Sequence, residues 1–165
     1  MTDPLTDRLR GWLGTLLGRR PSGLQVGALC VDALTGHVLL VTTRRTGSWT
    51  IPRGWPMSGR SMAGAAQQEA LEEAGARGEI AEAAMGRYRY KKKLGAGLTQ
   101  PVIVQVHLMQ VTTLERKYRE RGQRQRAWLT PEEAADRVAP PGLKALICGL
   151  APAQEGTPLP CARKR

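Results

Sequence analysis

Three glutamates in the middle of the chain have a spacing that could bind a divalent cation. Glu69, Glu72 and Glu73 lie in a segment rich in helix-forming residues, and positions i, i+3 and i+4 share one face of an α-helix. Like charges at this spacing repel each other, and a cation reverses that repulsion. Carboxylate oxygens suit Mg²⁺ or Mn²⁺, which bind phosphates beside one or two protein carboxylates. The spacing therefore predicts a divalent-metal site for a phosphorylated substrate.

A solvated acidic helix face is the alternative interpretation of these glutamates, because such runs are common on exposed helices. Their context favours the metal site. The glutamates follow a glycine-rich loop that begins at Gly54, they belong to a strongly basic chain, and their helix is expected between strands.

The elements that must position the glutamates are predicted from periodicity and from start and stop residues. Gly75 follows the central helix where a C-terminal glycine is expected, and Thr130 with Pro131 is a strong helix start. Two apolar segments joined by residues 33–36 are typical of a hairpin. The sequence predicts an α/β fold with strands over residues 25–32, 37–43, 49–52, 78–93, 100–112 and 126–129, and helices over 61–74, from 131 onward, and over about 141–150.

One folded domain with two extensions is expected from a length of 165 residues. Residues 1–24 carry leucines and a tryptophan at helical spacing, which predicts a short amphipathic helix that packs on the domain or touches a membrane or a partner. The predicted domain spans residues 25–150, and residues 151–165 are expected to form a disordered basic tail. The N-terminal apolar run is too short to span a bilayer and lacks a convincing cleavage site, so no transmembrane segment is expected.

The charge balance indicates a polyanionic partner. The chain has 25 Lys and Arg against 14 Asp and Glu, a net charge of +11, and a field of this sign attracts polyanions. A small phosphorylated molecule is favoured over nucleic acid, although the basic segment 116–126 could follow a nucleic-acid backbone. The three cysteines are widely spaced and form no CxxC pair, which indicates neither a zinc site nor a disulfide framework. We therefore expect a cytoplasmic protein; the oligomeric state is left open.

Basic residues outside the helix could bind the phosphates of a substrate. Cations alternate along the predicted strand 78–93 and should point to one side of it, which suggests a phosphate clamp. An edge strand protected by lysines is an equally weighted alternative. Further arginines lie in or near the loop that enters the helix and could make bidentate contacts. The cations of the strand are Arg87, Arg89, Lys91 and Lys93, and those near the loop are Arg44, Arg45 and Arg53.

The segment from Gly54 to Ala76 resembles the signature of the Nudix hydrolases, G-x5-E-x7-R-E-U-x-E-E-x-G-U, where U is aliphatic. Two positions depart from it: Arg60 replaces the first glutamate and Gln68 replaces the arginine. The resemblance covers about three-quarters of the chain, and a motif of this length with fixed spacing is specific. The matching residues are Gly54, Glu69, Ala70, Glu72, Glu73, Gly75 and Ala76.

The resemblance implies an α/β/α sandwich with a mixed central sheet and a site that binds Mg²⁺ or Mn²⁺. It implies that Glu69, Glu72 and Glu73 are ligands, with the backbone carbonyl of Gly54 as a further ligand. Water would be the nucleophile. The favoured general base is Glu73 or Glu72, the alternatives in the later loop are Glu115 and Glu120, and His107 is a weaker candidate.

The substrate implied by the resemblance is a small polyphosphorylated molecule with a phosphoanhydride bond. Residues 52–54 read Pro-Arg-Gly, similar to the Pro-Lys-Gly of members that act on diadenosine polyphosphates and diphosphoinositol polyphosphates, and residues 27–138 look most like the latter group. A diphosphoinositol polyphosphate is therefore expected first and a dinucleoside polyphosphate second. A catalytically weak Nudix-fold regulator that binds nucleotide or RNA is the alternative function.

Overall fold

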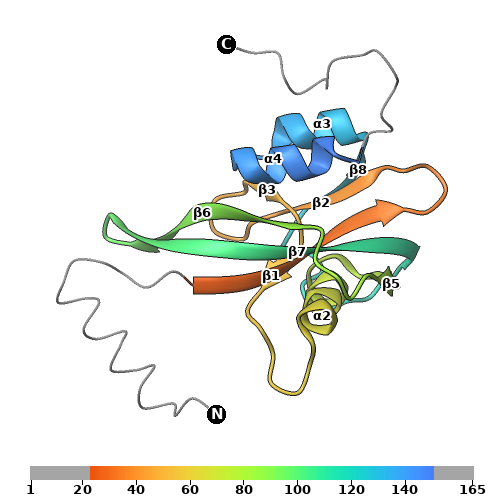
Figure 1. Cartoon of the computed structure of the whole chain (residues 1–165), viewed down its shortest axis with the longest axis horizontal. Coiled ribbons are helices and arrows are strands. Elements are labelled where there is room, and N and C mark those ends of the chain that lie inside the picture. The colour runs from red at the N-terminus through yellow and green to blue at the C-terminus, as the bar shows by residue number, and fades with distance from the viewer. Residues whose placement is uncertain (1–22, 151–165) are drawn as a thin grey trace.

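A single mixed sheet with helices on both faces makes up residues 23–150, the part of the chain that the computed structural model describes (Figure 1). The central pair of strands, β1 and β7, is parallel, and the other pairings are antiparallel. The strands are β1 (Gly23–Asp32), β2 (Val38–Thr42), β3 (Trp49–Thr50), β4 (Arg53–Gly54), β5 (Ala76–Ile80), β6 (Gly86–Gly95), β7 (Leu98–Leu114) and β8 (Arg126–Leu129). The helices are α2 (Met62–Ala74), α3 (Pro131–Arg137) and α4 (Pro141–Cys148).

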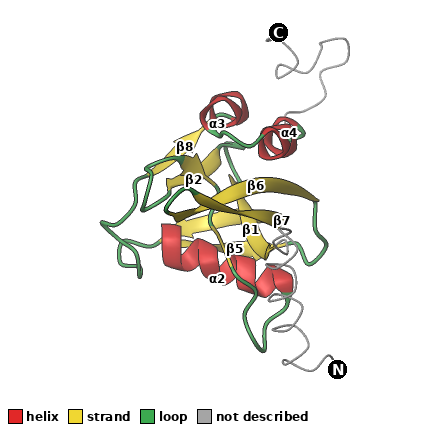
Figure 2. Cartoon of the chain, turned by 90° about the vertical axis from the view of Figure 1, so that its left-hand side faces the viewer, coloured by secondary structure: helices red, strands yellow, loops and turns green. Residues whose placement is uncertain are grey.

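The sheet follows the order β3-β2-β1-β7-β5, with β4 beside β1, β6 beside β7 and β8 beside β2. Helix α2 covers one face, and α3 and α4 cover the other (Figure 2). Strand β1 is buried on both faces: Val26 and Cys30 pack in the cluster under α2, and Leu29 packs in the cluster under α3 and α4. This arrangement is the predicted α/β/α sandwich.

The predicted strands and helices are present, with two differences that the sequence pattern did not indicate. The expected strand 49–52 ends at Thr50 in β3, and a further short strand, β4, follows at Arg53–Gly54. The expected strand 78–93 is divided into β5 and β6, and both pair with the 17-residue strand β7. Residues 81–85 separate them and have low strand propensity, because this Ala-Glu-Ala-Ala-Met stretch lacks β-branched and aromatic residues. The buried ring of His107 contacts the Ala81 carbonyl from β7 at 2.9 Å and fixes the position of the break.

Several expectations concern residues outside the described part of the chain. The N-terminal extension up to residue 22 and the tail 151–165 both lie there. Within residues 23–150, Cys30 is a buried free thiol. No described helix is long and apolar enough to cross a membrane.

Candidate active site

Helix α2 presents its glutamates because its opposite face is alanine-rich and packs on the sheet. The side chain of Ser61 caps the first turn by accepting a hydrogen bond from the Gly64 N–H at 3.0 Å. Glu69 and Glu72 are partly exposed, whereas Glu73 is only 6% exposed. The predicted grouping of the three carboxylates on one helix is confirmed. The buried alanines are Ala63, Ala65, Ala66, Ala70 and Ala74.

Gly75 ends the helix in the left-handed conformation, with φ of 68°. Its N–H donates to the carbonyls of Ala70 and Leu71 and so closes the last turn. A Cβ at this position would lie 2.7 Å from Cδ1 of Tyr118 and 3.0 Å from the Glu115 carbonyl oxygen. Glycine is therefore required both by the backbone angle and by the close approach of the segment 115–125.

Replacing Gly75 with alanine is expected to lower the free energy of unfolding by about 2–3 kcal/mol, the sum of a left-handed backbone cost and a steric contact. Urea unfolding would measure this change. Gly97→Ala is the matched control: Gly97 has φ of 74° but no neighbouring atom within 4 Å of its would-be Cβ, so only the backbone cost of about 1 kcal/mol applies. Equal losses in the two variants would show that the contact with Tyr118 contributes nothing.

The segment 115–125 wraps the C-terminal end of α2 and brings a fourth carboxylate to the site. The Glu115 N–H donates to the Gly75 carbonyl at 2.7 Å, and the Glu120 N–H donates to the Glu72 carbonyl at 3.0 Å. Arg126 donates to the carbonyl of Ala74, one of the last acceptors of the helix, at 2.5 Å. Glu120 is thereby placed next to the helix glutamates.

A cleft of about 560 Å³ opens between α2, the loop after β4 and the segment 115–125. It contains four carboxylates together with several arginines and a lysine, so charges of both signs line one cavity. Such a mixture suits a polyphosphate that is bound through cations on one side and metal ions on the other. The lining residues are Gln25, Arg44, Arg53, Gly54, Trp55, Glu69, Glu72, Glu73, Lys92, Arg119, Glu120, Gln123 and Arg124.

Each helix glutamate has a different electrostatic environment. Glu72 accepts from Gln68 Nε2 at 2.9 Å and pairs with Arg119, whose side chain is 72% exposed, at 2.8 Å. Glu73 pairs with the buried Arg124 at 2.5 Å and accepts from the Arg53 N–H at 3.2 Å. Burial, followed by the negative charges of Glu72 and Glu120, raises the pKa of Glu69. The site therefore holds more negative charge than its own environment favours.

Burial raises the pKa of Glu73 to about 7, although Arg124 and the Arg53 N–H favour the charged form. The folded protein therefore binds this proton more tightly than the unfolded chain, whose glutamate pKa is near 4.5. Stability from this group is present at low pH and is lost as the pH rises through about 7.

In metal-free buffer, the free energy of unfolding of the wild type relative to Glu73→Gln is expected to fall between pH ~5 and pH ~8. The upper bound is on the order of 3 kcal/mol, from a shift between 4.5 and about 7. Urea unfolding with EDTA at both pH values measures the difference. If the wild type and Glu73→Gln keep a constant difference across this range, Glu73 does not titrate there.

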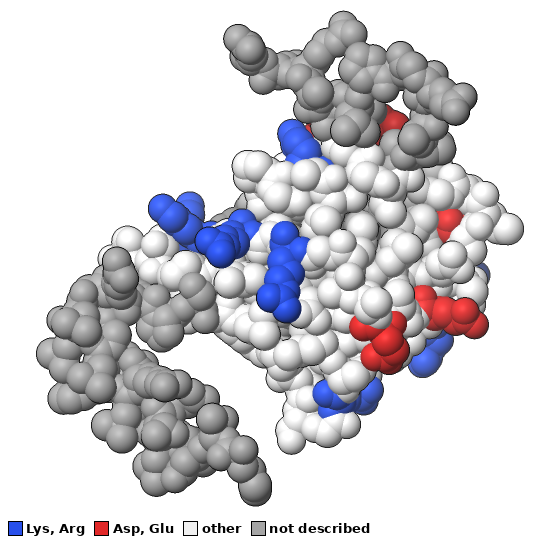
Figure 3. Space-filling model, viewed as in Figure 1, with Lys and Arg blue, Asp and Glu red and all other residues white. Residues whose placement is uncertain are grey.

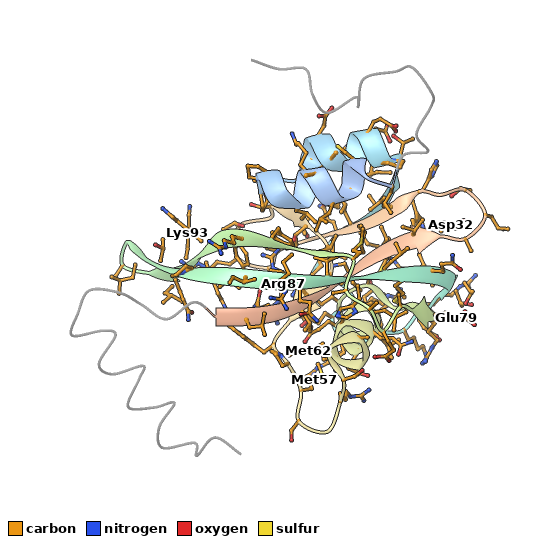
Figure 4. The ribbon with its side chains drawn as sticks, in the orientation of Figure 1. Asp32, Met57, Met62, Glu79, Arg87 and Lys93 are labelled. Carbon is orange, nitrogen blue, oxygen red and sulfur yellow. The ribbon has the colours of Figure 1, made fainter. Side chains whose placement is uncertain are left out.

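The predicted substrate-binding cations divide into three groups. Arg44 and Arg53 line the carboxylate cleft, as expected. Arg45, Arg89, Lys91 and Lys93 line a neighbouring cavity instead. Arg87 donates to Gln105 on the exposed face of β6 at 3.0 Å and lines neither cavity. Figure 4 shows Arg87 and Lys93 spread along β6, and Figure 3 shows cations gathered over this strand. The structure does not bring the predicted clamp to the cleft.

Lys92, on the tyrosine face of β6, is the cation of this strand that reaches the cleft. Its Nζ lies 4.9 Å from the centre of the Trp55 ring. The two-residue period predicted the alternation correctly, because Arg87, Arg89, Lys91 and Lys93 are all exposed while Tyr88 is buried. Which of the two faces of β6 points toward the cleft depends on how β6 pairs with β7. The two-residue period of the sequence carries no information on that pairing.

The neighbouring cavity, of about 610 Å³, has an apolar floor and a basic rim. Arg53 and Lys92 line both cavities and so join them. The Arg53 guanidinium lies 4.2 Å from the centre of the Tyr90 ring and donates to the Tyr88 hydroxyl at 3.2 Å. The apolar lining of this neighbouring cavity comprises Trp49, Tyr90, Ala139, Pro140 and Pro141.

Of the three alternative general bases, one lies in the cleft and two lie outside it. Glu120 lines the cleft, while Glu115 pairs with Arg77 at 2.5 Å outside it. His107 is 1% exposed and bonded to Gln105 and to the Ala81 carbonyl, also outside the cleft. Glu120 therefore joins Glu72 and Glu73 as a candidate base.

The residues of the cleft fit a divalent cation by their chemistry. A Cβ on Gly54 would lie 2.0 Å from Oε1 of Glu69, so the carboxylate occupies the space that any other side chain would fill. Burial, and after it the nearby charges of Glu72 and Glu120, raise the pKa of Glu69, so a cation beside this carboxylate would favour its charged form. Within the described residues, no three acidic, histidine or cysteine side chains already converge in a metal-binding arrangement. Arg119, which pairs with Glu72, lines the same cleft.

The profile of the family described as NUDIX domain matches residues 21–150. The chain belongs to the NUDIX domain family. This membership supports a phosphoanhydride hydrolase, the activity that the signature implies. Within the Nudix domain, Arg60 and Gln68, the two residues that depart from the signature, line a small cavity that shares no lining residue with the cleft. The amide of Gln68 nevertheless donates to Glu72, which lines the cleft.

Solved structures similar to this Nudix domain share its fold. A Nudix hydrolase from Nitrosomonas europaea has 20% identity and a TM-score of 0.59, covering 77% of this chain and 86% of that one. The E. coli dihydroneopterin triphosphate pyrophosphohydrolase has 15% identity and a TM-score of 0.56, covering 75% and 91%. The C. elegans Ap4A hydrolase has 18% identity and a TM-score of 0.53, covering 77% and 94%. No curated protein matches the sequence.

Proposed function

We propose that this Nudix protein hydrolyses a phosphoanhydride bond of a small polyphosphorylated substrate in a magnesium-dependent reaction. The observation that carries the proposal is the meeting of four carboxylates with Arg44, Arg53 and Lys92 in one cleft. Water would attack phosphorus, the bond to the leaving phosphate oxygen would break, and a carboxylate would take the proton from water. Glu72, Glu73 and Glu120 are the candidates for that proton acceptor.

Glu69, Glu72, Glu73 and the Gly54 carbonyl are the residues that would hold the metal. A bound divalent cation supplies positive charge to the diphosphate and to the attacking water. Arg44 is 58% exposed and could contact a phosphate directly, while Arg53 is fixed by the tyrosines and offers a preformed contact. Fixed cations of this kind stabilise the charge on the leaving phosphate without reorganising.

The substrate that the second cavity supports best is a dinucleoside polyphosphate. An apolar floor with Trp49 and Tyr90 suits a planar aromatic group, and the basic rim suits the attached phosphates. A diphosphoinositol polyphosphate, which the sequence favoured, has no aromatic group to use this floor. The likeness to the C. elegans Ap4A hydrolase in fold is consistent with this order.

The test is an assay of the purified protein with Mg²⁺ and a set of dinucleoside polyphosphates, inositol pyrophosphates and nucleoside triphosphates, with phosphate products measured. We expect the highest kcat/KM for a dinucleoside polyphosphate, and loss of activity with EDTA. Hydrolysis of inositol pyrophosphates alone would overturn the substrate class. No hydrolysis of any compound would overturn the enzyme function.

An RNA-binding regulator is less well supported by the segment 116–126. Three of its six cations contact α2 or its glutamates instead of forming an open basic row: Arg119 pairs with Glu72, Arg124 with Glu73, and Arg126 binds the Ala74 carbonyl. If the protein hydrolyses none of the compounds in that assay and binds RNA in a salt-dependent way, the RNA-binding function is favoured instead.

A further inference from the structure

We propose that Arg124 is the positioning residue of this site and holds the Glu73 carboxylate in the orientation that metal binding and hydrolysis require. The inference rests on the proposed function. It assigns a role to a residue that lies outside the signature helix and 51 positions from its partner in the chain.

All three nitrogens of the Arg124 guanidinium are engaged. Nε donates to Glu120 Oε2 at 2.5 Å, Nη1 to the Thr42 carbonyl at 2.9 Å and Nη2 to Glu73 Oε1 at 2.5 Å. The planar group therefore has one orientation, set by a strand end and by a loop carboxylate. A planar guanidinium held by three acceptors fixes the orientation of the Glu73 carboxylate, which the single ammonium charge of a lysine does not.

The backbone on which Arg124 sits is fixed at both ends. On one side, the Thr42 N–H donates to the Gln125 carbonyl at 3.0 Å, and the Gln125 N–H donates to Thr42 Oγ1 at 2.9 Å. On the other, the Glu120 N–H donates to the Glu72 carbonyl at 3.0 Å. The arginine is thus attached both to the sheet and to the helix that carries its target.

The helix itself does not supply this contact. Gln68, which stands where the signature has arginine, carries no charge and donates to Glu72 rather than Glu73. Among the described residues, Arg124 is the one cation within ion-pair distance of Glu73. Both side chains are buried, 9% and 7% exposed, so water does not replace the contact when it is lost.

The test is a double-mutant cycle with wild type, Arg124→Gln, Glu73→Gln and the double variant, measured for kcat, KM and Mn²⁺ affinity by calorimetry. Arg124→Gln is expected to lower kcat about 30-fold and to weaken Mn²⁺ binding about 10-fold, with KM changed less than about threefold. In the Glu73→Gln background the same change should add less than about threefold, because Arg124 acts through Glu73. Arg124→Lys should recover part of the loss, and Arg116→Gln, an exposed cation on the same segment, should match the wild type.

Additive losses in the cycle, or wild-type kcat and Mn²⁺ affinity in folded Arg124→Gln, would overturn the role. If Arg124→Gln does not fold, Arg124→Lys, which keeps the charge but loses the planar guanidinium, takes its place in the cycle, with smaller losses that should again nearly vanish in the Glu73→Gln background. Because Mn²⁺ affinity is read without substrate, the cycle tests Arg124 even if no compound is hydrolysed. Failure of the enzyme function and failure of the positioning role are therefore distinguishable.

Discussion

Replacing Glu72 or Glu73 with glutamine is expected to lower kcat by at least about 100-fold, because each change removes a negative charge from the group that would hold the metal. Glutamine keeps the size of glutamate and one of its two acceptor oxygens, so the folded structure should persist. Steady-state hydrolysis of the best substrate at saturating Mg²⁺ measures the effect. Circular dichroism and thermal unfolding confirm that the variants are folded.

Glu79→Gln is the matched control for these variants, because Glu79, labelled in Figure 4, is exposed on β5 and does not line the cleft. It should keep wild-type kcat within about twofold. Activity close to wild type in both Glu72→Gln and Glu73→Gln would mean that hydrolysis happens elsewhere in the molecule. A large loss in Glu79→Gln as well would point to net charge rather than to the site.

The two glutamines should also differ from each other. Glu72→Gln removes the pair with the exposed Arg119, which solvent readily replaces, whereas Glu73→Gln leaves the buried Arg124 without its anionic partner. The second change therefore affects stability as well as turnover. The comparison separates the electrostatic role that both residues share from the structural role of Glu73 alone.

The central helix could be predicted from the sequence because its signals are local. Ser61 caps its start, the alanines form its inner face, and Gly75 ends it, all within fifteen positions of one another. The same holds for α3, where Thr130 and Glu133 form a capping box around Pro131. Local geometry fixed the grouping of Glu69, Glu72 and Glu73 before any tertiary contact was known.

The rest of the site depends on contacts between distant segments. Glu120 reaches the cleft through a backbone bond to Glu72, and Arg124 through its contact with the end of β2. Neither contact leaves a periodic signal. The position of Lys92 rather than Lys91 in the cleft follows from the register of β6 against β7. A one-residue choice of face moves every side chain of a strand to the other side, which is why the predicted clamp does not line the cleft.

Gly54 combines a local sequence signal with a contact between distant segments. The signature predicted a glycine at this position, and the structure shows why a glycine is needed there. Strand β4 pairs with β1 at Val26↔Gly54, which fixes the backbone of the loop directly over α2. The Glu69 carboxyl group then fills the space beside the Gly54 Cα, with Oε1, Cδ and Oε2 at 2.0, 2.2 and 2.7 Å from a would-be Cβ. An added methyl group has no room unless Glu69 moves.

Gly54→Ala is therefore expected to lower kcat by about 100-fold, since a displacement of about 1 Å in a positioned catalytic group has that effect. Mn²⁺ affinity should fall in parallel. The free energy of unfolding should change little, because the Glu69 side chain can move toward the open cleft. Gly149→Ala is the control: Gly149 caps the end of α4, and its would-be Cβ meets only ordinary contacts, the nearest at 3.4 Å. Helix α4 covers the opposite face of the sheet from α2 (Figure 2).

A second background decides whether the effect passes through Glu69. In Glu69→Ala the side chain that occupies the space is absent, so adding the methyl group at Gly54 should cost less than about threefold in kcat. A full 100-fold loss in that background would show that the methyl group acts on the loop backbone or on the substrate instead. Wild-type turnover of Gly54→Ala itself would mean that the carboxylate of Glu69 has room to spare, and that its close packing on Gly54 has no part in the chemistry of the cleft.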